Sequence, residues 1–473
     1  MIKIKELFIT DKQFYKEVFR LVLPLTAINS TSLILSFFDV FMLGRTGDMS
    51  ETAISAAKIA SQPFFLFSML MFGSMSGAMV LCSQYWGKKD TDTINSIAGT
   101  TLAVLLPISI IFMSVCFIFA KQIMGLISGD ATVVEMAVIY LRILLPSIIL
   151  NLLSGLFSGI LRSVENVKIP MAASFAGITV NIILDAILIY GFFGFPKLGI
   201  QGAATAALIA RTIEFSVILI YVAFFEKTVK FTLKKMFRIH IFILRDFFKY
   251  SLPVIANEFI WGFGMTIHSS VIGHMSKDQY AAYTVSGMIG QIAELSMIGF
   301  ATGCCIIIGK SIGEGKDNNT VMKYARTFQG LAVFFALITG GITFVLRDII
   351  INLFEISDIT KTYASQLFTV MVIISIAKTF NCVSIVGIIR GGGDTKTGMI
   401  LDACAMYFWG IPLGFFAMYV FKLNVIFVCA LLISDELIKV PVCFLRIKSR
   451  KWIRNITRSK EETGKTEKIG DGI

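Results

Sequence analysis

The chain alternates long apolar stretches with short polar connections along nearly its whole length. A helix that crosses a membrane needs about 20 apolar residues. Twelve segments meet this requirement, near residues 16–43, 54–84, 94–120, 134–160, 169–192, 199–225, 247–272, 280–308, 324–346, 362–388, 398–420 and 424–446. Because these spans leave almost no room for a soluble domain, the pattern predicts an all-α polytopic membrane protein.

The apolar pattern occurs twice, once in each half of the chain. Three pairs of residues share one offset along the sequence, namely Pro24 with Pro253, Gly44 with Gly273, and the polar pair Gln62 with Gln291. The motif G159-I-L-R162 recurs as G387-I-I-R390 at nearly the same offset. Six spans in each half give both halves the same orientation, so we expect two six-helix bundles related by a pseudo-twofold axis along the membrane normal. Transporters with such parallel repeats bind substrate between the bundles.

The repeat and the charged connections predict four regions. Residues 1–225 form an N-terminal six-helix lobe and residues 247–446 a C-terminal one. Residues 226–246 form a basic cytoplasmic linker, and residues 447–473 a basic cytoplasmic tail.

The distribution of basic residues predicts the orientation in the membrane. The 473 residues are 56% hydrophobic and 16% charged, with a net charge of +12. Lys and Arg outside the spans concentrate on the side that holds both termini, and positive residues stay in the cytoplasm. The charge therefore indicates a multi-pass protein of the bacterial plasma membrane with both termini cytoplasmic. It also suits contact with anionic membrane lipids better than contact with nucleic acid.

Three polar side chains within predicted spans of the first half are candidates for one site. A charged residue at the centre of a membrane helix costs roughly 2.5–3.5 kcal/mol on insertion scales, so such residues default to a functional role. Asp39 lies in the first span, and Asn181 and Asp185 share one face of the fifth because they are four residues apart. Together they could supply oxygen ligands to one Na⁺ or share one proton. The alternative is that each carboxylate completes a hydrogen-bond network within the bundle.

The repeat relates these positions to polar residues of the second half. The offset from Pro24 to Pro253, applied to Asp39, leads to His268, and applied to Asn29 it leads to Glu258. His268 has an unperturbed pKa near physiological pH and is a candidate for proton coupling, although a packing role is the simpler interpretation. Glu258 is a candidate for a coupling or substrate role.

Lys378 is a deeply placed cation that needs a partner. We expect Asp402 or Glu258, and the pair would act either as a gate or as a fixed link between helices. Pairs at helical spacing, Arg211 with Glu214 and Asp435 with Lys439, are expected to be structural ion pairs. Glycines four residues apart, which permit close helix contact, are Gly73 with Gly77, Gly155 with Gly159, and Gly410 with Gly414.

No motif indicates an enzyme or a cofactor. The segment G303-C-C-I-I-I-G-K-S311 has five residues between its glycines, where a phosphate-binding loop needs four. The eight cysteines show no disulfide or zinc spacing.

The motifs together resemble the multidrug and toxic compound extrusion (MATE) family, and within it the DinF-like bacterial branch. The motifs are G159-I-L-R162, N181-I-I-L-D185, the run L-G-I-Q-G-A-A-T-A from Leu198, and G387-I-I-R-G-G-G-D-T-K396. The resemblance covers nearly the whole chain. It implies twelve helices in two lobes that form a V, and export of amphipathic, often cationic compounds driven by Na⁺ or H⁺.

The resemblance also implies particular site residues. Asp39, Asn181 and Asp185 match the family's cation or proton site in the N-terminal lobe, with Thr205 beside them on the sixth span. The polar positions that match in the C-terminal lobe are Lys378, Asn381 and Asp402.

The sequence therefore predicts a secondary antiporter that acts as a monomer, has no cofactor, and uses Na⁺ or H⁺ as the coupling ion. A lipid-linked saccharide flippase of the same superfamily is the first alternative, but it would need a strongly cationic central cavity, and few basic residues lie within the spans. A receptor or scaffold is the second, but sensing requires no ion path.

Overall fold

The computed structural model describes residues 9–43, 50–232, 236, 240–354 and 356–458. The backbone of Asp39 belongs to this part, but its side chain lies outside the described residues. Within the described part, the regular secondary structure is helical. Each of the twelve predicted spans coincides with one helix, or with consecutive helices separated by at most two residues.

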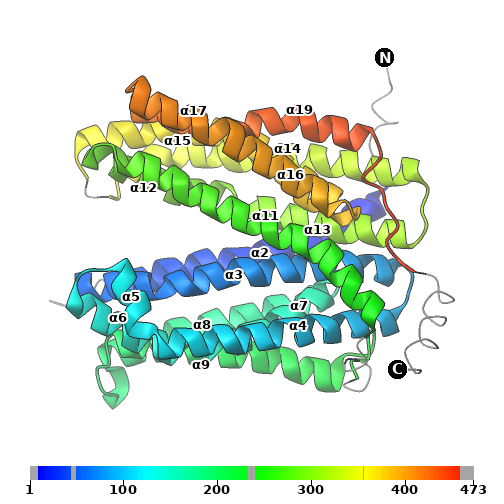
Figure 1. The fold of residues 1–473 in the computed structure, drawn as a ribbon, viewed down its shortest axis with the longest axis horizontal. Helices are drawn as coiled ribbons and strands as arrows, with labels where there is room; N and C mark the ends of the chain where they lie inside the picture. The colour runs from blue at the N-terminus through cyan, green and yellow to red at the C-terminus, as the bar shows by residue number, and fades with distance from the viewer. Residues whose placement is uncertain (1–8, 44–49, 233–235, 237–239, 355, 459–473) are drawn as a thin grey trace.

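The first six spans form the N lobe, coloured blue to green in Figure 1. They are α2 (Lys12–Leu43), α3 (Ser50–Gly87), α4 (Thr91–Ile118), α6 (Ala131–Leu144) with α7 (Ser147–Ser163), α8 (Lys168–Tyr190), and α9 (Ile200–Ile220) with the π-helical turn η2 (Tyr221–Phe225). A short helix that the sequence did not predict, α5 (Ala120–Ile127), connects the third and fourth spans, and the 3-10 turn η1 (Phe192–Gly194) follows α8. Helices α6 and α7 are bent by 46° at a break that includes Pro146.

The other six spans form the C lobe, coloured green to red in Figure 1. They are α11 (Ile241–Gly273), α12 (Lys277–Ala293) with α13 (Leu295–Gly313), α14 (Asn318–Ile351), α15 (Asp358–Cys382) with η3 (Val383–Ile389), α16 (Thr395–Ala405) with η4 (Met406–Gly410), α17 (Ile411–Phe415) and η5 (Phe416–Val420), and α18 (Val425–Leu432) with α19 (Asp435–Lys448). Since α11 begins at Ile241, the last six residues of the predicted linker are helical.

Two of the twelve spans are less apolar than the others. Nine helices of the described part are long and apolar enough to cross a membrane, and the bent pair α6–α7 makes a tenth. The remaining spans are α11, which carries Glu258 and His268, and the pair α18–α19, which carries Glu436 and Lys439. The helices that depart from the apolar pattern thus contribute part of the polar content of the C lobe.

The two lobes share a hydrophobic core at one end and have separate cores at the other. The shared core contains Val22 and Leu81 of the N lobe together with Cys305 and Phe328 of the C lobe. Trp452, near the end of the described chain, and Phe14, near its beginning, belong to the same core. The opposite ends of the lobes are built around two further clusters, one within each lobe. We call the region of the shared core, where α2 and α3 meet α11 and α13, the seam.

The helices of the seam approach so closely that side chains are excluded at some positions. A Cβ added to Gly313 of α13 would lie 1.9 Å from the carbonyl oxygen of Gln84 in α3, and one added to Gly77 would lie 2.5 Å from the Cα of Ser251 in α11. The predicted close contact at Gly155 and Gly159 is wrong, because a Cβ at either position would meet nothing within 4 Å. Spacing alone does not tell which face of a helix meets a neighbour.

An ion cluster also bridges the seam. Lys310 of α13 lies 3.0 Å from Glu17 of α2 and 2.5 Å from Glu165 in the turn after α7. Burial raises the pKa of the Glu165 carboxyl, and the hydrogen bond from the Lys310 ammonium acts against that rise. The C lobe thus contributes one ammonium to two carboxylates of the N lobe.

The segment after α19, residues 449–458, crosses the seam, and we call it the tail segment. Its Trp452 is fully buried and donates from Nε1 to the carbonyl of Ile447 (3.0 Å). On the N-lobe side, Gln84 donates to the carbonyl of Arg454 (3.1 Å) and accepts from the backbone N–H of Ile456 (2.9 Å). The tail segment therefore belongs covalently to the C lobe and is hydrogen-bonded to the N lobe.

Candidate functional site

A polar pair is buried in the N lobe, on the face of α8 that meets α9. Asn181 and Asp185 are 2% and 1% exposed. With its amide oriented to suit its neighbours, Asn181 donates to Asp185 Oδ2 (2.9 Å) and accepts from the backbone N–H of Ala207 (3.2 Å). The i, i+4 spacing brings the two side chains together, as the sequence predicted. The result is a carboxylate held in place inside an apolar bundle.

The first span passes beside this pair. Helix α2 packs against α8, and Tyr190 at the end of α8 donates to the carbonyl of Met42 (2.8 Å). Because the side chain of Asp39 lies outside the described residues, its place in the predicted N-lobe site stays a prediction. The hydroxyl of Thr205 donates within its own helix, to the carbonyl of Gln201 (2.8 Å), a bond that fixes it to α9.

The C lobe holds a larger group of charged side chains, centred on Lys439 of α19. Its Nζ lies 3.2 Å from Asp402 of α16, 3.0 Å from Asp435 and 3.0 Å from Glu436. The Lys439 side chain is 4% exposed. We call these four side chains the C-lobe cage. The predicted pair of Asp435 with Lys439 is present, as is that of Arg211 with Glu214 (2.7 Å).

The predicted partners of Lys378 are wrong. Lys378 of α15 donates to both carboxylate oxygens of Glu294, each at 2.7 Å. Glu294 stands at the break between α12 and α13, so the helix break turns its carboxylate toward α15. Asp402 pairs with Lys439, and Glu258 pairs with Arg390.

Asn381 connects the Lys378 region to the cage. Its Nδ2 donates to the carbonyl oxygen of Glu436 (2.6 Å) and to Glu436 Oε2 (2.8 Å). Two residues after it, α15 continues as the π-helical turn η3, and such turns often occur at functional sites. The structure thus joins Asn381 and Asp402, two predicted site residues, through Glu436 and Lys439.

Arg390, the last residue of the G-I-I-R motif, forms a buried link across the seam. It is 3% exposed and lies 3.2 Å from Glu258 of α11. It also donates to the hydroxyl of Ser76 in α3, at 3.0 Å. Glu258 is therefore held by a C-lobe guanidinium that also contacts the N lobe.

The remaining predicted residues lie in different surroundings. His268 of α11 is 2% exposed and interacts electrostatically with Lys439, Lys378 and Glu436. Gln62 of α3 and Gln291 of α12 are exposed. Sequence reasoning missed Glu436, whose signal was its position three residues before Lys439 on one helix face.

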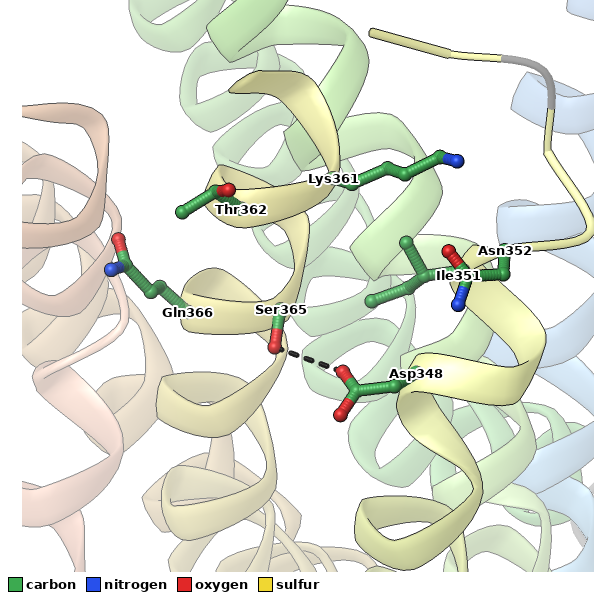
Figure 2. Close-up of a pocket in the computed structure, with 7 residues that line it drawn as sticks. All are labelled: Asp348, Ile351, Asn352, Lys361, Thr362, Ser365 and Gln366. Atoms are coloured by element: carbon green, nitrogen blue, oxygen red, sulfur yellow. Dashed lines mark hydrogen bonds between the residues drawn. The ribbon is translucent and has the colours of Figure 1, made fainter. Parts of the chain in front are cut away.

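A pocket of about 390 Å³ lies apart from these groups, between the end of α14 and the start of α15. Figure 2 shows its lining, in which Ser365 donates to Asp348 Oδ1 (3.1 Å). It contains none of the predicted site residues.

The ion pair of Lys378 with Glu294 gives a direct test of a fixed link. We expect Glu294→Lys to lower the yield of folded protein, because two ammonium groups would then face each other, and Glu294→Lys with Lys378→Glu to restore it. Monodisperse protein on size-exclusion chromatography is the measurement. If the double variant is no better than the single one, the pair has a role that depends on which helix carries the charge.

Two repeated helical lobes with ionisable groups buried in each have the architecture of a secondary membrane transporter. A family model described as MatE matches residues 24–187 and again residues 253–416, so its two matches begin at the repeated prolines Pro24 and Pro253. The chain belongs to the multidrug and toxic compound extrusion (MATE) family, whose members are transporters and not enzymes.

Individual relatives agree with this assignment over nearly their full length. The chain is 23% identical to a probable multidrug resistance protein NorM of Thermotoga maritima over 461 residues, 94% of this chain and 95% of the relative. It is 26% identical to the uncharacterized transporter YisQ of Bacillus subtilis, over 94% and 96% of the two chains. A solved outward-facing multidrug resistance MATE transporter has a TM-score of 0.83 at 20% identity, covering 92% of this chain and 96% of the other. Assignment to the DinF-like branch stays a prediction.

Proposed function

We propose that this protein is an antiporter that exports amphipathic, often cationic compounds in exchange for Na⁺ or H⁺. It acts as a monomer in the bacterial plasma membrane, in contact with its lipids, with both termini cytoplasmic. The observation that carries the proposal is the buried carboxylate of Asp185, held by Asn181 beside α2, in a chain of this family. Relatives named as multidrug resistance proteins support export of drugs over flipping of lipid-linked saccharides.

The position of the shared core supports an outward-facing state under this topology. The lobes share a core at the end where the described chain begins and ends, since Phe14 and Ile456 belong to it, and the basic residues predict that this side is cytoplasmic. The opposite ends of the lobes have cores of their own. Substrate would leave and the coupling ion would enter between those ends.

The chemistry at Asp185 explains how an ion can drive the cycle. An ionised carboxylate in an apolar bundle is unfavourable, and a proton or a cation bound to it removes that cost. Binding therefore changes the packing that α8 and its neighbour α2 prefer, and α2 also contributes to the seam. The charge at Asp185 can in this way alter the balance between the two states of the transporter.

Transport into proteoliposomes under one imposed gradient at a time tests the proposal. We expect one of the two imposed gradients, of Na⁺ or of pH, to move a fluorescent cationic dye against its own concentration gradient. We expect no such movement when neither gradient is imposed. The gradient that drives movement identifies the coupling ion. Dye movement that is the same with and without gradients contradicts antiport.

A further inference from the structure

The C-lobe cage has a cation at its centre. The Lys439 ammonium has three N–H donors, and three carboxylates lie within 3.2 Å of it, those of Asp402, Asp435 and Glu436. Lys439 thus occupies the position that a free cation would take among these carboxylates.

The surroundings of the cage leave it with excess negative charge. Within the cage, Lys439 faces the carboxylates of Asp402, Asp435 and Glu436. Among the other described residues, the charged groups nearby are two ion pairs, Lys378 with Glu294 and Arg390 with Glu258. The other titratable groups that face it are His268 from α11, Cys382 from α15 and Cys443 from α19. With every group in its charged form, five carboxylates and three cations carry two negative charges in excess. Such an excess inside a bundle favours uptake of positive charge.

Besides Asp435 Oδ2 within the cage, two buried polar atoms at the cage but outside its four side chains have no hydrogen-bond partner among the described residues. Asn381 is 2% exposed, and its Oδ1 has no hydrogen-bond partner among the described residues although its Nδ2 holds Glu436. His268 Nε2 is likewise without a partner in that part of the chain. An amide oxygen can only accept, and an imidazole nitrogen accepts in one tautomer. Both atoms can therefore accept a hydrogen bond from an added donor.

A proton supplies what the cage lacks, because a protonated carboxyl group has one negative charge less and gains an O–H donor. A sodium ion does not fit in the same way, since Lys439 fills the centre. Among the described residues, no group of three or more His, Cys, Asp and Glu side chains is arranged to hold a metal ion.

We propose that the C-lobe cage is a proton-binding site of this transporter, in which Lys439 acts as a tethered cation that excludes Na⁺. The site takes up one proton on the carboxylates of Asp402, Asp435 and Glu436. It lies in the lobe opposite Asp185, so it goes beyond the proposed function and does not depend on it.

Proton uptake by purified protein, measured with a pH indicator in weakly buffered detergent solution, tests the proposal without any transport. The background is Asp39→Asn with Asp185→Asn, which removes the N-lobe carboxylates. On acidification from mildly alkaline to mildly acidic solution, we expect this background to take up about one proton more per molecule than the same protein with Asp402→Asn, because that change removes one excess charge. The control is Asp348→Asn, whose carboxylate is exposed and should leave the uptake unchanged.

Removal of the tethered cation tests the role of Lys439. We expect Lys439→Met in this background to take up about one proton more than the background protein. We also expect NaCl to raise the thermal stability of Lys439→Met relative to choline chloride, and to have no such effect on the background protein. Equal uptake with and without Asp402→Asn overturns the proton site. Absence of a Na⁺ effect in folded Lys439→Met overturns the role of the lysine. If Lys439→Met does not fold, the comparison with Asp402→Asn still decides the main claim.

Discussion

Replacement of Asp185 by Asn is expected to remove most of the gradient-driven efflux while the protein still folds. The change keeps the shape of the side chain and its contact with Asn181 (2.9 Å), but it removes the charge that binds the coupling ion. We expect a loss on the order of a hundredfold in coupled transport, the upper range for coupling between two ligands of one protein. Initial rates of dye movement in proteoliposomes under the driving gradient provide the measurement.

A matched variant separates this effect from a general loss of carboxylates. Asp348→Asn changes an exposed side chain near the end of α14 and should transport at the unmodified rate. The thermal unfolding temperature of Asp185→Asn should be no lower than that of the unmodified protein, because a neutral amide is easier to bury than a carboxylate. Full efflux by folded Asp185→Asn would exclude Asp185 as the coupling residue.

Gly313→Ala forces the seam open. The new Cβ would lie 1.9 Å from the carbonyl oxygen of Gln84, which is backbone and cannot rotate away. The lobes must separate there to relieve the clash. Cys82 in α3 is fully buried in the shared core, so a thiol reagent should reach it faster in the variant. A rise of at least about tenfold corresponds to about 1.4 kcal/mol in the equilibrium between closed and open seam.

The control for this prediction is Gly155→Ala in α7. Its Cβ would meet nothing within 4 Å, so the same chemical change should leave alkylation of Cys82 as it was. Both variants are made in a version of the chain that retains Cys82 alone among the cysteines. Equal rates in the two variants contradict the role assigned to the close approach at Gly313.

The spans and the repeat could be predicted because they depend on patterns along the chain. Twelve apolar runs, and an offset that several residue pairs share, survive small errors at helix ends. The partner of Lys378 could not be predicted, because an ion pair between helices depends on rotation of each helix and on local breaks. Glu294 reaches Lys378 from the break between α12 and α13. Because the break itself contains no proline or glycine, the sequence does not predict it.

The repeat also explains where the two lobes differ. The offset that relates Pro24 to Pro253 places Gly410 and Gly414 where Asn181 and Asp185 stand in the N lobe. A Cβ on either glycine would collide with Leu432 at the end of α18. The C lobe therefore has no carboxylate at these two positions. Its acidic side chains lie at Asp402, earlier in the same span, and at Asp435 and Glu436 near the start of α19, so a search for a copied aspartate would miss them.

The tail segment has a consequence for the timing of transport. Its hydrogen bonds with Gln84 hold the last residues of one lobe to the other, beside the backbone contact between Arg454 and Gly392 (2.9 Å). When the transporter opens to the cytoplasmic side, either the bonds of the tail segment to Gln84 or its bond to Gly392 must break, and they must form again when that side closes. The length of time that the protein waits before it turns inward is therefore set partly by a short stretch of chain that contacts neither ion nor drug.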